Sequence, residues 1–108
     1  MTRSFTEQKR KKLIQAVVCE IYESVQECRC GNYWISERYN IFCELGYTIS
    51  GGRIACTYLT VNLEKYDTDG ECEDCEIDSE NTNSVSQTEL KVAVTKIIER
   101  NEKLWAEI

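Results

Sequence analysis

The chain has 108 residues, of which 42% are hydrophobic and 30% are charged, and its formal net charge is −6. This length predicts one domain over residues 1–108, and the hydrophobic share is too high for a disordered chain. Histidine is absent, which removes the usual general base and the commonest metal ligand, so a histidine-activated serine or cysteine nucleophile is excluded.

The first expected element is a helix that begins near Ser4. Ser4 and Glu7 have the S-x-x-E spacing of a capping box, in which each side chain accepts a hydrogen bond from the other residue's free backbone N–H. Gly31 and Asn32 are expected to end this helix, because both tolerate the left-handed conformation of a C-terminal cap. Apolar residues at three- and four-residue steps form its expected buried stripe: Ile14, Val17, Val18, Ile21, Val25 and Cys28.

The middle of the chain is typical of antiparallel strands. We expect a short strand at residues 33–35, then a strand over residues 41–49, where apolar and polar side chains alternate. Gly51-Gly52 suits a two-residue hairpin turn. The apolar parity changes after Tyr58, which predicts a β-bulge near Tyr58 and Leu59. Folding about the turn pairs three sets of residues on one face: Ile49 with Ile54, Tyr47 with Cys56, and Leu45 with Tyr58.

A second turn is expected at residues 67–70, followed by a candidate edge strand at 71–77 and a polar linker at 78–84. Ser86 and Glu89 form a second capping box, which predicts a C-terminal helix. Its expected buried stripe consists of Leu90, Val94, Ile97, Ile98, Leu104, Trp105 and Ile108. The element order predicts an α+β fold, in which an N-terminal helix, an antiparallel three- to four-stranded meander and a C-terminal helix form a two-layer αβββ(β)α sandwich.

The cysteines and the apolar runs bear on the compartment. Seven cysteines are an odd number, so complete internal pairing is impossible, and we expect mostly reduced thiols in a cytoplasmic protein. The longest strictly apolar run, residues 16–19, is far shorter than the ~20 residues of a membrane span. The basic N-terminal region lacks the clean apolar segment of a signal peptide.

Residues 64–80 carry the most unusual pattern in the chain, with nine carboxylates and a single cation, Lys65. A solvated turn is the plainer interpretation of such charge. Self-repulsion on this scale nevertheless costs stability unless positive charge from a partner neutralises it, which favours a surface for binding a basic partner. The candidate partner-binding residues are Glu64, Asp67, Asp69, Glu71, Glu73, Asp74, Glu76, Asp78 and Glu80.

Metal and redox sites are alternative interpretations of the same segment. Cys72 and Cys75 have the spacing of a zinc knuckle, and Cys28 and Cys30 could complete a four-thiolate zinc site, although the neighbouring acids oppose it. Those acids also oppose a reactive disulfide pair, because reactive cysteines need electropositive surroundings.

A calcium loop of the EF-hand type fails at its first ligand position, which Lys65 would occupy. A looser calcium site from Asp67, Asp69 and Glu71 stays open. We expect no cofactor, and zinc is the alternative.

A basic stretch at the N-terminus contrasts with the acidic residues 64–80, and we call the two segments the basic and the acidic pole. It consists of Arg3, Lys9, Arg10, Lys11 and Lys12. Consecutive helical residues point 100° apart, so these cations do not form one face, and a solvated helix start is the plainer interpretation. Contact with the acidic segment of a second copy is the alternative, which would make the protein a homo-oligomer.

Together these patterns favour a non-enzymatic acidic protein-interaction module. Its most concrete form is an inhibitor that imitates nucleic acid and occupies the basic surface of a nuclease or another nucleic-acid-binding protein. In size, acidity and mixed architecture the chain resembles phage-encoded anti-CRISPR and other anti-defence inhibitors, through these gross features and no motif. The net negative charge disfavours direct nucleic-acid binding. A cysteine-clustered zinc-binding structural module and a self-associating protein are the rival hypotheses.

Overall fold

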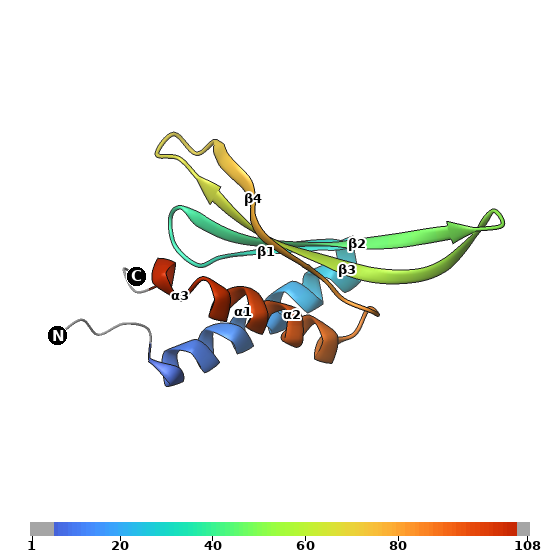
Figure 1. Ribbon diagram of the computed structural model, residues 1–108, viewed down its shortest axis with the longest axis horizontal. Helices are drawn as coiled ribbons and strands as arrows, with labels where there is room; N and C mark the ends of the chain where they lie inside the picture. Colours follow the sequence, from blue (N-terminus) through green and yellow to red (C-terminus); the bar gives the residue numbers. More distant parts are fainter. Residues whose placement is uncertain (1–5, 106–108) are drawn as a thin grey trace.

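Two long helices lie on one face of a four-stranded antiparallel sheet in the computed structural model, which describes residues 6–105 (Figure 1). The strands pair in chain order, β1-β2-β3-β4, so the sheet is a meander. This arrangement confirms the predicted α+β fold, with four strands. The elements are α1 (Glu7–Cys28), β1 (Cys30–Trp34), β2 (Tyr39–Ser50), β3 (Arg53–Tyr66), β4 (Cys72–Asn81), α2 (Gln87–Arg100) and α3 (Glu102–Trp105).

Both ends of α1 differ from the sequence prediction. Thr6 is its N-cap, and the Thr6 side chain accepts a hydrogen bond from the backbone N–H of Lys9 at 3.2 Å. The expected cap residue, Ser4, lies outside the described residues. At the other end Arg29 has the left-handed conformation, with φ of 68°, and its N–H bonds to the carbonyl of Val25 at 2.8 Å.

Gly31 and Asn32 therefore belong to β1, and the prediction that they cap α1 is wrong. The structure gives Gly31 another role. A Cβ atom at Gly31 would lie 2.7 Å from the Cβ of Ser24 and 3.1 Å from the carbonyl oxygen of Ile21. The glycine lets β1 run directly alongside α1, so close approach explains this residue better than the helix end does.

The β2–β3 hairpin turns at Gly51 and Gly52, which both have positive φ. Ile49 lies opposite Ile54, as predicted, but the register then shifts and Ala55 is the additional residue on β3. The predicted bulge near Tyr58 and Leu59 is therefore closer to the turn. Beyond it the pairs are Thr48 with Cys56, Tyr47 with Thr57, Gly46 with Tyr58, and Leu45 with Leu59. The predicted partners of Tyr47 and Leu45 are wrong, because Cys56 and Tyr58 belong to the other face of the sheet.

β4 extends further than the sequence predicted. The sequence predicts a candidate edge strand at residues 71–77 and a linker at 78–84, yet the strand begins at Cys72 and continues to Asn81. Its polar side chains find partners across the edge of the sheet. The Ser79 hydroxyl donates to Asn62 at 2.7 Å, and Asp78 lies opposite Leu63. The register with β3 shifts twice beyond Leu63, so the part of β4 near Cys72 is irregular.

The C-terminal helix has the predicted start and an earlier end. Ser86 caps α2 by accepting a hydrogen bond from the N–H of Glu89 at 3.1 Å. The Glu89 carboxylate accepts from the N–H of Asn83 at 3.1 Å, so it contacts the preceding loop. Helix α2 ends at Arg100, and the short α3 follows after Asn101. Trp105 of α3 lies in the core, where its indole N–H donates to the carbonyl of Ile98 at 2.8 Å.

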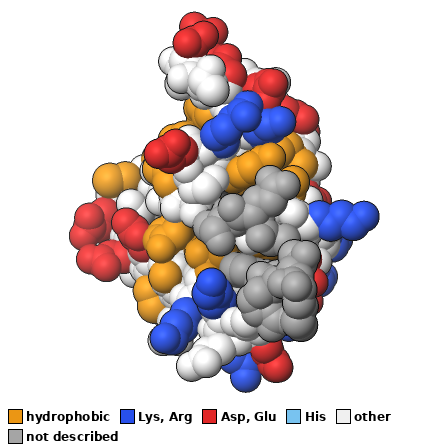
Figure 2. Space-filling model, turned by 90° about the vertical axis from the view of Figure 1, so that its left-hand side faces the viewer, with side chains coloured by type: hydrophobic (Ala, Val, Ile, Leu, Met, Phe, Trp, Pro, Cys, Tyr) orange, Lys and Arg blue, Asp and Glu red, His pale blue; other side chains and the backbone are white. Residues whose placement is uncertain are grey.

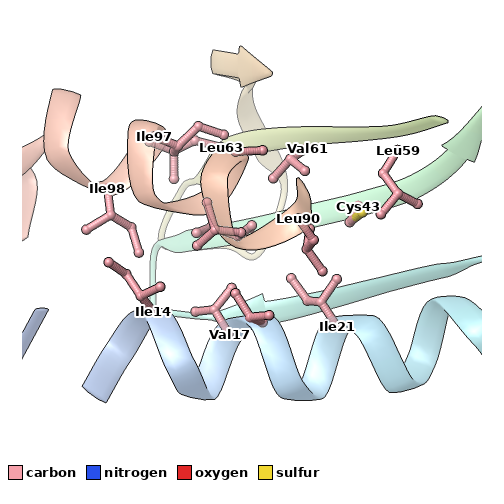
Figure 3. Close-up of a cluster of buried hydrophobic side chains, with 14 of the residues drawn as sticks. Ile14, Val17, Ile21, Cys43, Leu59, Val61, Leu63, Leu90, Ile97 and Ile98 are labelled. Carbon is pink, nitrogen blue, oxygen red and sulfur yellow. The ribbon is translucent and has the colours of Figure 1, made fainter. Parts of the chain in front are cut away.

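The core lies between the sheet and the two long helices (Figure 3). α1 contributes Ile14, Val17, Val18, Ile21 and Val25, and the sheet contributes Ile41, Cys43, Leu59, Val61 and Leu63. α2 and α3 contribute Leu90, Ala93, Val94, Ile97, Ile98 and Trp105. The predicted stripes are confirmed except that Cys28 is exposed and Leu104 is partly buried, while Ile108 lies outside the described residues. Each fully buried Leu or Ile stabilises the fold by roughly 1.5–3 kcal/mol.

The molecule is elongated because the β2–β3 hairpin extends well past the helices (Figure 1). The principal extents are 57 × 31 × 22 Å, and the radius of gyration is 14.7 Å. A compact chain of this length has a radius of gyration of about 13 Å. The protruding hairpin therefore exposes sheet surface that no helix covers.

Candidate functional site

The acidic segment forms the hairpin between β3 and β4. Figure 2 shows acidic side chains at the top of the molecule, where this hairpin ends, with basic side chains just below them. The turn uses Gly70, whose φ of 84° suits glycine. The nine candidate carboxylates do not share one environment, and the contacts divide them into three groups.

The first group consists of carboxylates that form ion pairs with cations of the same molecule, and two of them bind cations of α2. Asp78 and Glu80 both bind Arg100, at 2.8 and 2.7 Å, and Glu80 lies 3.8 Å from Lys96. Burial alone would raise the pKa of Asp78. The hydrogen bonds from Arg100 and Asn101 outweigh that effect and hold its pKa below the ordinary value. These two acids therefore fasten β4 to α2 and are not free for a partner.

Glu73 is neutralised in the same way at the other end of β4. Its carboxylate lies 3.3 Å from the Arg38 guanidinium and 3.2 Å from the Lys65 ammonium. Arg38 also donates to the carbonyl of Tyr66 at 2.9 Å, so it connects the loop before β2 to the hairpin. Glu73 thus has a structural role that the sequence pattern did not reveal.

The second group is the acidic tip, which we define as Asp67, Asp69, Glu71, Asp74 and Glu76. Asp67 accepts hydrogen bonds from the backbone N–H groups of Asp69 and Glu71, each at 2.9 Å, and Asp74 accepts from the N–H of Glu76 at 3.1 Å. These contacts fix the turn. None of the five has an ion pair within residues 6–105, and all except the partly buried Asp67 are exposed, so the tip is the uncompensated part of the segment.

Glu64 stands apart from both groups. It lies on the face of the sheet opposite the helices, which we name the open face, and it accepts hydrogen bonds from Asn40 at 2.9 Å and Tyr66 at 3.0 Å. The expectation that all nine carboxylates form a single partner-binding row is therefore wrong. Cross-strand pairing separates Glu64 from the tip, and ion pairs withdraw Glu73, Asp78 and Glu80.

The structure does not bring the four candidate zinc ligands together. Cys30 lies opposite Glu44, and thus in the same row of the sheet as Thr60, whereas Cys72 lies opposite Tyr66. Six residues of strand separate these rows, which is about 20 Å. The four-cysteine site is therefore wrong as a geometry. Within the described part of the chain, no group of three or more Cys, Asp or Glu side chains is arranged to hold a metal ion.

Cys72 and Cys75 form a disulfide, with their Cα atoms 5.9 Å apart, and Cys19, Cys28, Cys30, Cys43 and Cys56 are free. The pairing differs from the expectation that the acidic neighbours oppose it. The physical reason is proximity, because the irregular part of β4 places the two residues at a separation typical of disulfides. Nearby acids slow thiolate chemistry by raising the pKa of a thiol, but they do not prevent a bond between neighbours.

Some cations of the basic N-terminal stretch form ion pairs within the molecule. Arg10 forms an ion pair with Glu102 of α3, and Lys11 lies 3.9 Å from Glu7. Arg3 lies outside the described residues. The stretch therefore contributes to fastening α1 and α3, and its remaining described cations, Lys9 and Lys12, are exposed.

Two exposed features of the sheet were not among the predicted site residues. Tyr47, Ile49 and Ile54 are 54%, 63% and 63% exposed on the hairpin that extends past the helices, and Trp34 is 48% exposed on the open face. One signal was available. Arg53 is the only charged residue between positions 45 and 63, which is an unusually low charge density for a surface hairpin.

No family model, curated protein or solved structure matches the chain. Among the described helices, none is both long enough and apolar enough to cross a membrane. Fold and site together therefore define the protein as an α+β meander sandwich with an acidic hairpin tip.

Proposed function

We propose that this protein is a non-enzymatic interaction module whose acidic tip binds a basic surface of a partner protein. The distribution of ion pairs carries this proposal. The fold pairs Asp78 and Glu80 with cations of α2, and Glu73 with Arg38 and Lys65, while none of the five acids of the tip forms an ion pair within the described residues. Such a concentration of like charge is costly unless a partner compensates it, and it speeds the encounter with a positively charged surface.

The most concrete form of this function is inhibition of a nuclease or another nucleic-acid-binding protein by imitation of nucleic acid. A basic surface that binds phosphates attracts any well-spaced row of negative charge. The exposed acids of the tip, Asp69, Glu71, Asp74 and Glu76, bring four negative charges together within eight residues. The gross likeness to anti-CRISPR and anti-defence inhibitors agrees with this form. A cytoplasmic location would keep the five free thiols reduced, and it would expose the Cys72–Cys75 disulfide to the same reductants.

A matched pair of triple variants tests the proposal. The tip variant Asp69→Asn, Glu71→Gln, Glu76→Gln removes three charges whose carboxylates form no hydrogen bond or ion pair within the described residues. The control variant Glu20→Gln, Glu23→Gln, Glu27→Gln removes the same number of charges from the exposed surface of α1. Each protein is immobilised and used to capture partners from a bacterial lysate.

Wild type and control should recover the same protein, the tip variant should lose it, and added duplex DNA should displace it. The released protein should bind DNA in a separate assay. Equal recovery by all three proteins would contradict binding through the tip. If recovery depends on the tip but DNA does not displace the partner, the protein is an interaction module that does not imitate nucleic acid.

Self-association is a second candidate function, and the extended β2–β3 hairpin favours it. Tyr47, Ile49 and Ile54 expose apolar surface on the face that continues the core, which is a surface suited to a second copy. Sedimentation across a salt series separates the two ways of associating. Contacts between the basic and acidic poles weaken as salt rises, whereas an apolar contact persists. A monomer at every salt concentration would contradict both.

A further inference from the structure

Trp34, Tyr66 and Glu64 form a corner on the open face that has the chemistry of a cation site. Trp34 and Glu64 lie in one row across β1, β2 and β3, with Asn40 between them. Tyr66 is two residues beyond Glu64 on the same face, and the rings of Trp34 and Tyr66 meet with their centroids 4.8 Å apart and their planes tilted by 56°. We name Trp34, Tyr66 and Glu64 the Trp34 corner.

A chain of hydrogen bonds fixes Glu64 and Tyr66 in the corner. Asn32 donates to Asn40 at 3.1 Å, Asn40 donates to Glu64 at 2.9 Å, and the Tyr66 hydroxyl donates to the same carboxylate oxygen at 3.0 Å. Asn40 is only 3% exposed, although it lies on the face that no helix covers, because its larger neighbours enclose it. Burial, followed by the hydrogen bond and charge of Glu64, raises the pKa of Tyr66, so this phenol stays protonated as a donor.

The carboxylate of Glu64 retains binding capacity. Both of its hydrogen bonds reach Oε1, and within the described residues Oε2 has no partner and Glu64 has no ion pair. The nearest cation by sequence is Lys65, which binds Glu73, and Arg38 also binds Glu73 together with the carbonyl of Tyr66. The cations around the corner are thus already committed to other groups.

We propose that the Trp34 corner binds an arginine side chain of the basic partner. A guanidinium can stack on the exposed Trp34 ring while one edge of its planar fork donates to Glu64 Oε2. Lysine fits less well, because its ammonium lacks both the flat stacking surface and the fork. This inference rests on the proposed function for the existence of a basic partner, and it adds a specific contact to the general attraction of the acidic tip.

The test uses a blocked tripeptide, acetyl-Gly-Arg-Gly-amide, as the probe, with the neutral, nearly isosteric citrulline peptide as its control. The indole N–H of Trp34 in ¹⁵N-labelled protein reports binding, and the buried indole of Trp105 serves as an internal reference. We expect a saturable shift of the Trp34 signal with the arginine peptide, weaker binding of the lysine peptide, and the weakest binding of the citrulline peptide. Removal of the positive charge should weaken binding by about 2- to 30-fold.

Two variants assign the effect to the corner. Glu64→Gln keeps an acceptor for Asn40 and Tyr66 but removes the charge, and should weaken binding of the arginine peptide. Glu44→Gln removes a carboxylate from another row of the same face and should not. Equal shifts with arginine and citrulline, or an unmoved Trp34 signal, would overturn the proposal, and neither comparison requires a variant to fold.

A variant of the acidic tip distinguishes failure of the corner from failure of the proposed function. The tip variant Asp69→Asn, Glu71→Gln, Glu76→Gln should bind the arginine tripeptide as wild type does. If the tripeptide fails to bind while partner capture still depends on the tip, the corner is wrong and the proposed function stands. If the tripeptide binds and the tip variant captures as much partner as wild type, the corner stands and the proposed function of the tip is wrong.

Discussion

Arg100 in α2 donates hydrogen bonds to both carboxylate oxygens of Asp78 on β4, at 3.0 and 2.8 Å. This fork ties the edge strand to the helix layer, and its third contact, to Glu80 at 2.7 Å, lengthens the attachment along β4. It therefore helps to determine how the base of the acidic hairpin sits on the molecule.

The variant Arg100→Gln should lower the free energy of unfolding by about 1 kcal/mol. Exposed ion pairs contribute about 0.2–1 kcal/mol, and the bidentate geometry places this one at the upper end of that range. Urea denaturation followed by circular dichroism measures the change. Lys91→Gln, which removes another cation from the same helix, should alter stability far less. An equal loss in the two variants would mean that charge on α2 matters and the fork does not.

The contribution of this contact should depend on pH in one direction. The folded pKa of Asp78 lies below its unfolded value of about 3.9, so the stabilisation is present above that value and is lost as pH falls through the folded pKa. The difference in unfolding free energy between wild type and Arg100→Gln should stay constant from pH 7 to about pH 5. It should then shrink toward pH 2, and a difference that grows on acidification would contradict the assignment.

Thiol titration should divide the seven cysteines into three classes. Cys19, Cys28, Cys30 and Cys56 are exposed and should react with an aromatic disulfide reagent in the folded protein. Cys43 should react only after unfolding, because burial, with smaller contributions from Glu44 and Cys30, raises its pKa to about 12.

Cys72 and Cys75 form the third class and should react only after reduction. The expected counts are four thiols in the folded protein, five after denaturation, and seven after denaturation with a reductant. A count of six in the folded, unreduced protein would contradict the disulfide.

Gly31→Ala should destabilise the fold more than Gly46→Ala. The new methyl group at position 31 would meet the backbone of Ile21 and the Cβ of Ser24, which are fixed by α1, and overpacking of this kind costs roughly 1–3 kcal/mol. At position 46 it would meet the outer part of the Tyr58 ring, 2.7 Å away, which can turn aside. Chemical denaturation of both variants gives the comparison, and equal losses would remove close approach as the reason for Gly31.

The order of elements could be predicted because helix and strand leave different periods in the sequence. The stripe of α1 from Ile14 to Val25 and the alternation of β2 both follow directly from core burial. The bulge in the β2–β3 hairpin was predicted at the wrong position because Cys56 and Tyr58 are apolar residues on the open face. Hydrophobicity alone assigned them to the core. The end of β4 was missed because an edge strand can satisfy polar residues such as Asp78 and Ser79 with cross-strand and helix partners.

The candidate site was predicted only in part. Local charge density located the hairpin correctly, but charge density says nothing about which carboxylates meet a cation. Arg100 is separated from Asp78 by 22 positions and Arg38 from Glu73 by 35, so these pairings exist only through tertiary structure. Trp34 and Tyr66 likewise become neighbours only after β1, β2 and β3 are aligned.

The irregular pairing of β4 has a consequence for the behaviour of the protein in concentrated solution. β4 is one of the two edge strands of the sheet, and the outer side of such a strand is a template on which further chains can add to form fibres. Its two register shifts and its exposed carboxylates make that side a poor template, since a second copy would bring the same charges into contact. The side chains that we assign to partner attraction thereby also disfavour polymerisation through the β4 edge.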